Sequence, residues 1–161
     1  MGKKLAMIVM VLGVISVAAG GVYIGLGMQK NDYLVKQLRA QDVTLGLTSA
    51  QVAKGDLVDN MQEAQVAANT LSEHLSSIAK TYTDLEAANP NGKYDPSNTT
   101  DLSYTQGLNM ENSFNLVVLA FGVIQETEVT GITLLVIGAA IIFVGVILFR
   151  KDKSAPANQL K

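Results

Sequence analysis

Two stretches without a charged residue decide the fold. Residues 5–28 read LAMIVMVLGVISVAAGGVYIGLGM, and residues 131–149 read GITLLVIGAAIIFVGVILF. As helices they would reach about 36 Å and about 28 Å, against a hydrocarbon core of roughly 30 Å in a bilayer. A mean hydropathy of +0.27 and a charged fraction of 16% also exclude an ordinary soluble domain. Both stretches are therefore predicted to be transmembrane helices.

The first stretch has a competing interpretation, a cleaved signal peptide. Lys3 and Lys4 would supply the basic start, and Val17-Ala18-Ala19 the small-residue cleavage site. The apolar run, however, continues for nine residues past Ala19. A signal peptide usually has an apolar region of only about 7 to 15 residues. The sequence therefore favours an uncleaved helix.

The distribution of charge predicts the orientation in the membrane. Residues 1–4 and 150–161 together hold six basic residues and one acidic residue, so their net charge is +5. Residues 29–130 hold six basic and thirteen acidic residues, so their net charge is −7. Lys and Arg are concentrated in cytoplasmic segments. We therefore expect two cytoplasmic tails and an acidic extracytoplasmic domain in a cell membrane.

Both predicted spans carry glycine at every seventh residue, which places each set on one stripe of its helix. Small residues on such stripes allow close approach of helix backbones in lipid. In an antiparallel hairpin the expected pairs are Gly13 with Gly145, Gly20 with Gly138, and Gly27 with Gly131. Gly21 and Gly25 form a separate GxxxG pair, suited to homodimerisation or to docking a larger partner, although glycine is also simply common in membrane helices.

The region between the spans contains an apolar seam with alternating spacings of four and three. The pattern predicts one helix over residues 57–85, with an N-cap at Asp56 and a stop at Asn89-Pro90. The seam residues are Leu57, Met61, Ala64, Ala68, Leu71, Leu75, Ile78, Tyr82 and Leu85.

The same period of seven extends both spans beyond the membrane. Leu34 and Gln41 continue the first stripe, and Ile124 and Val117 continue the second, which predicts a two-helix stalk with Leu34 opposite Ile124 and Gln41 opposite Val117. Residues 42–55 and 89–107 are predicted to be irregular connectors, the first with one helical turn after Thr48.

Residues 113–125 are apolar nearly all round but too short to span a membrane. Such a run is typical of a buried core helix or an interfacial helix. An uncovered face of it would bind another subunit. The candidate docking residues are Phe114, Val117, Phe121 and Ile124.

Residues that could carry chemistry are sparse. His74 is the one histidine and the chain has no cysteine, so a single chain cannot build a multi-histidine or thiolate metal site. Oxygens of Asp95, Ser97, Asn98 and Asp101 could approach a cation, but the EF-hand spacing is missing and turn formation explains them better. We expect no catalytic residue, metal or cofactor, and an acidic domain disfavours nucleic acid as a partner.

Several short motifs lie between the two spans. They are Val43-Thr44-Leu45-Gly46, His74, Ile78-Ala79, Thr81-Tyr82, Lys93-Tyr94-Asp95-Pro96, Leu102-Ser103-Tyr104 and Leu108-Asn109-Met110-Glu111-Asn112. These motifs resemble a group of small bacterial two-span membrane proteins that has no assigned activity. The resemblance implies a bacterial cell-membrane protein and brings no ligand with it.

Together these patterns predict an all-α membrane protein, with an antiparallel transmembrane hairpin extended into an extracytoplasmic helical bundle. The expected role is a non-enzymatic accessory or scaffold subunit. Its expected partners are membrane lipid and either another membrane protein or a second copy. The alternative is an extracytoplasmic sensory or ligand-binding module, which would signal through a separate protein because residues 150–161 are too short for a transmitter domain.

Overall fold

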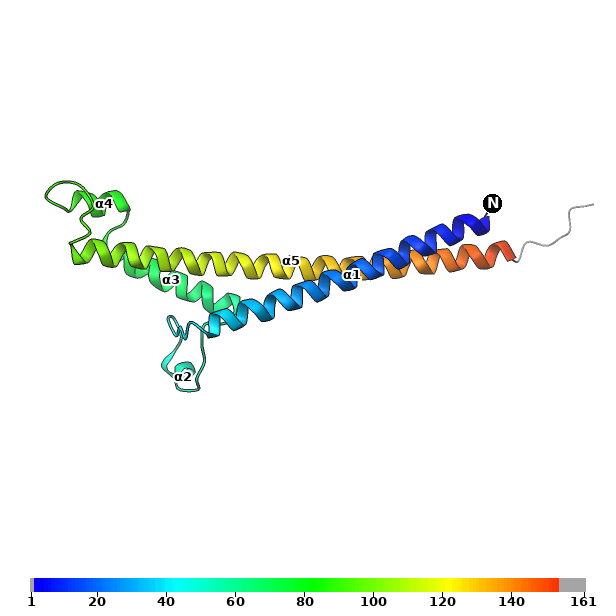
Figure 1. The fold of residues 1–161 in the computed structure, drawn as a ribbon, viewed down its shortest axis with the longest axis horizontal. Coiled ribbons are helices and arrows are strands. Elements are labelled where there is room, and N and C mark those ends of the chain that lie inside the picture. Colours follow the sequence, from blue (N-terminus) through cyan, green and yellow to red (C-terminus); the bar gives the residue numbers. More distant parts are fainter. Residues whose placement is uncertain (1, 154–161) are drawn as a thin grey trace, which may run out of the picture. The chain divides into compact units, whose positions relative to one another are not determined.

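The computed structural model describes residues 2–153, which form helices and connecting loops without a strand (Figure 1). The predicted all-α class is therefore confirmed for this part of the chain. The last eight residues of the predicted C-terminal tail lie outside it. The helices are α1 (Gly2–Arg39), α2 (Ser49–Val52), α3 (Met61–Ile78), α4 (Tyr82–Ala87) and α5 (Thr99–Lys153).

Helices α1 and α5 are each long and apolar enough to cross a membrane. In a soluble protein such helices would be mostly buried, yet only 17% and 11% of their most apolar windows are buried. Large apolar side chains point outward instead; Ile15 is 58% exposed and Phe143 is 67% exposed. Exposure of this much apolar surface is compatible with lipid rather than with water.

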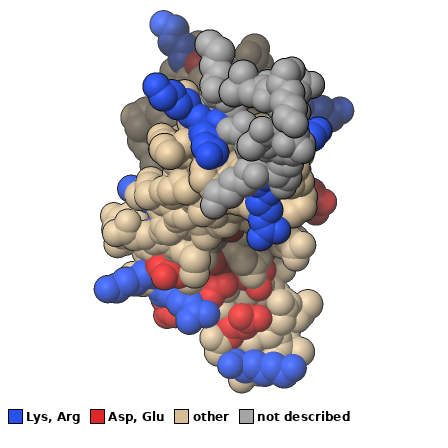
Figure 2. All heavy atoms as spheres, turned by 90° about the vertical axis from the view of Figure 1, so that its right-hand side faces the viewer, with Lys and Arg blue, Asp and Glu red and all other residues tan. Residues whose placement is uncertain are grey.

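The chain divides into two compact units. Unit 1 contains α1 up to Lys30 and α5 from Ile124 onward, and unit 2 contains Asn31–Val123. Within unit 1 the blue part of α1 runs beside the orange part of α5 (Figure 1). Figure 2 faces the end of unit 1 where α1 begins and α5 ends, and Lys and Arg side chains project there. Lys3, Lys4, Arg150 and Lys151 are exposed.

Unit 2 has a small core in two clusters. In the first, Ala64, Ala67 and Ala68 of α3 pack against Phe114 of α5 and Val58 of the preceding loop. Alanines on the contact side allow α3 to lie close to α5, as the predicted seam requires.

The second cluster contains Leu75 of α3, Leu85 of α4 and Tyr104 of α5. Gly107 of α5 also lies under Leu75, because a Cβ there would fall 2.8 Å from a Leu75 methyl. Apolar residues of the predicted seam are thus buried on both α3 and α4.

The prediction of one helix over residues 57–85 is wrong at its start and near its end. The N-cap is Asn60, not Asp56, because the Asn60 side chain accepts a 3.0 Å hydrogen bond from the Glu63 backbone N–H. At the other end Ala79 is extended, and the Thr81 hydroxyl accepts a hydrogen bond from Asp84 N–H to start α4. A second cap therefore interrupts the helix although the apolar seam continues.

The predicted connectors are partly confirmed. Helix α2 follows Thr48, which forms a capping box with Gln51. Helix α1 ends at Arg39, and Asp42 adopts a φ of 54°, so Gln41 lies in a turn outside the helix. The connector over 89–107 is shorter than expected, since α5 already begins at Thr99, where the Asn98 side chain accepts from Thr100 N–H.

Candidate helix-packing and docking sites

The two helices of unit 1 meet at glycines. A Cβ on Gly13 would lie 2.8 Å from the Gly138 carbonyl oxygen, and one on Gly20 would lie 2.6 Å from the Gly131 carbonyl oxygen. The facing glycines of α5 are equally confined, since Cβ atoms on Gly131 and Gly138 would lie 2.8 Å from the carbonyl oxygens of Gly20 and Gly13. No larger residue fits these four positions without movement of a backbone.

The outer members of the two stripes face other residues. A Cβ on Gly145 would lie 3.3 Å from the Ala6 carbonyl oxygen and 3.1 Å from Met10 N. A Cβ on Gly27 would collide with the side chain of Glu128, so this glycine makes room for a carboxylate-bearing chain rather than for a backbone.

The predicted pairing of the stripes is therefore wrong by one heptad. Gly13 lies against Gly138 instead of Gly145, and Gly20 lies against Gly131 instead of Gly138. Seven residues correspond to about 10 Å of helix. A repeat of seven defines the contacting face of each helix. It does not fix the axial offset between the two helices, because a shift by seven residues again brings glycine opposite glycine.

A hydrogen bond that the sequence did not predict also joins these helices. The Ser16 hydroxyl of α1 donates to the Leu134 carbonyl oxygen of α5 over 2.9 Å. Serine within an apolar span is the sequence signal that could have indicated it, because hydroxyls often bond across helices in lipid. The bond adds a polar contact to an otherwise apolar interface.

The GxxxG pair lies away from this interface. A Cβ built on Gly21 or on Gly25 would meet no atom within 4 Å, and both residues are exposed. The contact between α1 and α5 thus leaves a second small-residue face of α1 uncovered.

The candidate docking residues of α5 are not the exposed ones. Phe114 and Phe121 are only 6% and 5% exposed, and Val117 and Ile124 are half-buried. Phe114 and Val117 contribute to the core of unit 2, so they cannot contact a partner without unpacking it. The exposed side of this stretch carries Leu116 and Leu119 instead, at 66% and 63% exposure.

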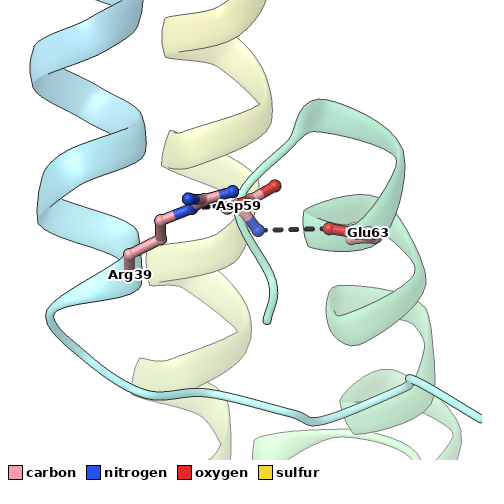
Figure 3. A network of polar contacts seen from close by, with 3 residues as sticks. All are labelled: Arg39, Asp59 and Glu63. Carbon is pink, nitrogen blue, oxygen red and sulfur yellow. Dashed lines mark hydrogen bonds and ion pairs between the residues drawn. The ribbon is translucent and has the colours of Figure 1, made fainter. Parts of the chain in front are cut away.

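A polar network joins the end of α1 to the start of α3 within unit 2 (Figure 3). Arg39 forms a 2.6 Å ion pair with Asp59, whose backbone N–H donates to the Glu63 carboxylate. The Arg39 side chain is 65% exposed. Water screens such a pair, so it orients the chain more than it stabilises it.

The loop before α5 is held by a buried carboxylate. Asp101 is 1% exposed and accepts hydrogen bonds from the Asn89 side chain and from Asp95 N–H. Asn89 in turn accepts from the Asn98 side chain. These oxygens and amides satisfy one another, which agrees with the turn interpretation of Asp95, Asn98 and Asp101.

The exposed end of this loop carries a perturbed carboxyl group. The side-chain hydroxyl and then the backbone N–H of Ser97 donate to Asp95, and these hydrogen bonds lower the pKa of Asp95.

Possible ligands for a metal do not gather in the described part of the chain. Between residues 2 and 153 no group of three His, Asp or Glu side chains is placed to hold a metal ion. His74 is exposed on α3 beside a shallow hollow that Glu73, Thr70 and Leu71 also line.

Helix packing and apolar faces thus distinguish this chain more clearly than any cluster of reactive groups. Comparison with protein-family models, with characterised proteins and with solved structures gives no match.

Proposed function

We propose that the chain is a two-span protein of a cell membrane, with α1 and the second half of α5 as an antiparallel hairpin. Both termini would lie in the cytoplasm, and residues 29–130 would form an extracytoplasmic helical bundle. The exposed apolar side chains of unit 1 support this placement. The charge distribution also supports it, because Lys3 and Lys4 precede the first span and Arg150 and Lys151 follow the second.

Its proposed role is that of a non-enzymatic accessory or scaffold subunit of a membrane complex. The observation that carries this proposal is the uncovered face at Gly21 and Gly25, where added Cβ atoms would meet nothing. Lipid provides no hydrophobic drive between helices, so association depends on close backbone contact at small residues. A helix of another subunit, or of a second copy, could approach α1 there.

A second surface of the same role lies on α5 in unit 2. Leu116 and Leu119 are one turn apart and largely exposed, although water surrounds an extracytoplasmic domain. Neighbouring exposed apolar residues outside the spans are typical of contact surfaces between proteins. We assign the docking role to this side of α5 and no longer to Phe114 and Phe121.

Copurification tests the proposal. The full chain, extracted in a mild detergent, is expected to retain a partner protein or a second copy. Gly25→Leu should reduce the retained amount about tenfold or more, because the added side chain separates the two backbones. Val22→Leu is the matched control, since Val22 is 61% exposed on α1 and already bears a branched side chain.

Two results would count against the scaffold role. One is recovery of the native chain as a lone monomer from detergent and from lipid nanodiscs alike. The other is equal retention by Gly25→Leu and the native chain, which would remove the glycine face from the assembly.

A sensory or ligand-binding module is the second candidate function, and one observation favours it. Unit 2 contains a cavity of about 470 Å³, within the range of roughly 300 to 1,000 Å³ that is usual for ligand pockets. A sensor should change the amount of copurified partner when the cavity is filled, whereas a scaffold should not. Copurification with and without ligand therefore separates the two functions.

A further inference from the structure

The cavity of unit 2 lies where three segments of the chain meet. Leu38 and Gln41 line it from the end of α1 and the turn that follows, and Val43 and Val58 line it from the loops before and after α2. The rest of its wall is one side of α5: Asn109, Met110, Ser113, Phe114 and Val117.

Parts of this wall are well fixed. Val58 is 1% exposed and Phe114 is 6% exposed, and both belong to the first core cluster. The Val58 N–H donates to the Val43 carbonyl oxygen over 2.9 Å, which ties the two loop segments together. The cavity is therefore a feature of the packed unit and not a gap between loose loops.

Met110 forms a more adaptable part of the wall. It is 48% exposed, and a methionine side chain can adjust its shape to an occupant.

The lining offers no opposite charge to a charged ligand. None of the nine lining residues is acidic, basic or a histidine, and six of them are apolar. A charged group placed there would lose hydration without gaining an opposite charge. The lining thus suits an occupant whose body is apolar.

Three polar residues supply the remaining surface. Asn109 and Ser113 are four residues apart and so share one strip of α5, and Gln41 comes from the turn after α1. The Ser113 hydroxyl already donates to the Asn109 carbonyl oxygen, but Gln41 and Asn109 are exposed residues whose side-chain amides can donate and accept. They can recognise one neutral polar head group.

We infer that this cavity binds an uncharged single-chain amphiphile, with its apolar tail against Val43, Met110 and Val117 and its neutral head group at Gln41 and Asn109. This inference does not depend on the proposed scaffold role, because binding in unit 2 is measured without any partner protein.

The test uses the full chain in phosphatidylcholine nanodiscs and a dodecanol that carries a photoreactive diazirine in its tail. Mass spectrometry then locates the cross-linked residues. We expect saturable labelling at Met110, Phe114 or Val117, and unlabelled dodecanol should compete about tenfold better than dodecane or dodecanoate. The double variant Gln41→Leu/Asn109→Leu should lower the preference for dodecanol by a factor of about three to ten, as expected for lost hydrogen bonds.

A cavity-filling variant provides the control for location. Met110→Trp should reduce labelling of the cavity about tenfold, and because Met110 is half exposed the larger side chain should leave the melting temperature near that of the native chain. Leu102→Trp, at an exposed position of the same helix outside the cavity, should not change the labelling.

Three results would overturn the inference. Labelling confined to residues 5–28 and 131–149 would show partition into lipid only. Equal competition by dodecanoate would exclude a preference for a neutral head. Efficient disulfide formation between two Met110→Cys chains, with no labelling of the cavity by dodecanol, would identify the groove as an interface between copies.

Discussion

At the scale of single residues, two adjacent glycines of α1 have opposite surroundings. A Cβ on Gly20 would fall 2.6 Å from the Gly131 carbonyl oxygen, whereas a Cβ on Gly21 would meet nothing within 4 Å. Gly20→Leu should force α1 and α5 apart and destabilise unit 1 by about 1–3 kcal/mol, the usual cost of overpacking. Thermal unfolding of the full chain in detergent, monitored by circular dichroism, measures this loss of stability.

Gly21→Leu is the matched control, because it adds the same side chain one residue away. Its melting temperature should equal that of the native chain or rise slightly, since leucine favours the helix more than glycine does. Equal destabilisation by the two variants would contradict the assignment of Gly20 to the interface.

The loop carboxyl Asp95 allows a prediction about pH. Its pKa is lowered because the Ser97 hydroxyl and backbone N–H donate to the carboxylate. The folded state thus favours the charged form, so the stabilising effect is present above the ordinary pKa of about 3.9 and is lost as the pH falls through the lowered value. Ser97→Ala should raise the pKa of Asp95 toward its ordinary value.

Carboxyl-carbon NMR titration of the full chain measures that shift directly. Ser103→Ala, an exposed serine inside α5, is the control and should leave the titration of Asp95 unchanged. If Ser97→Ala also left it unchanged, another group would have to account for the low pKa.

At the scale of helices and loops, a local cap decides where the segment between the spans breaks. The apolar seam predicts an uninterrupted helix from 57 to 85, yet Ala79 is extended and α4 begins anew after Thr81. The Thr81 hydroxyl accepts from Asp84 N–H over 3.1 Å. Thr81→Val should therefore lower the stability of unit 2 by about 1 kcal/mol, as for other lost N-caps.

Thr83→Val tests whether that loss is specific to the cap. Thr83 is also exposed and lies within α4, but its side chain is not at the N-cap. Chemical denaturation of the full chain should show a smaller change for Thr83→Val than for Thr81→Val. The reverse order would mean that the hydrogen bond to Asp84 does not hold the start of α4.

Periodicity predicted the faces of these helices better than their ends or their register. The spacing of Ala64, Ala68 and Leu75 identified the side of α3 that is buried. It could not show that Asn60 or Thr81 would outcompete helix propagation, because capping depends on side-chain hydrogen bonds. Nor could it distinguish Gly13 facing Gly138 from Gly13 facing Gly145, since both satisfy a repeat of seven.

The candidate docking face shows the same limit for a run that is apolar nearly all round. Within residues 114–124 Asn115 is the one polar side chain, which is too little to mark the outside, so the sequence could not tell that Phe114 is in the core while Leu116 is exposed. Only the position of α3 beside α5, through Ala64 and Ala68, decides which side is covered.

At the scale of the whole chain, length and charge must agree on one topology. Unit 1 supplies two apolar helices, and the contact of Gly145 with Ala6 brings the end of α5 beside the start of α1. Because Lys3, Lys4, Arg150 and Lys151 all belong to that end, the positive-inside rule predicts that it lies in the cytoplasm. The proposed topology then places the acidic region of residues 29–130 outside.

Cysteine labelling can test this topology without background, because the native chain contains no cysteine. Asn91→Cys lies in an exposed loop of unit 2 and should react with a membrane-impermeant maleimide in intact cells. Gly2→Cys, at the start of α1, should react only after the membrane is opened. The opposite labelling pattern would show the inverted topology. Cleavage as a signal peptide would instead give a mature chain that lacks the mass of residues 1–19 and carries no label at residue 2.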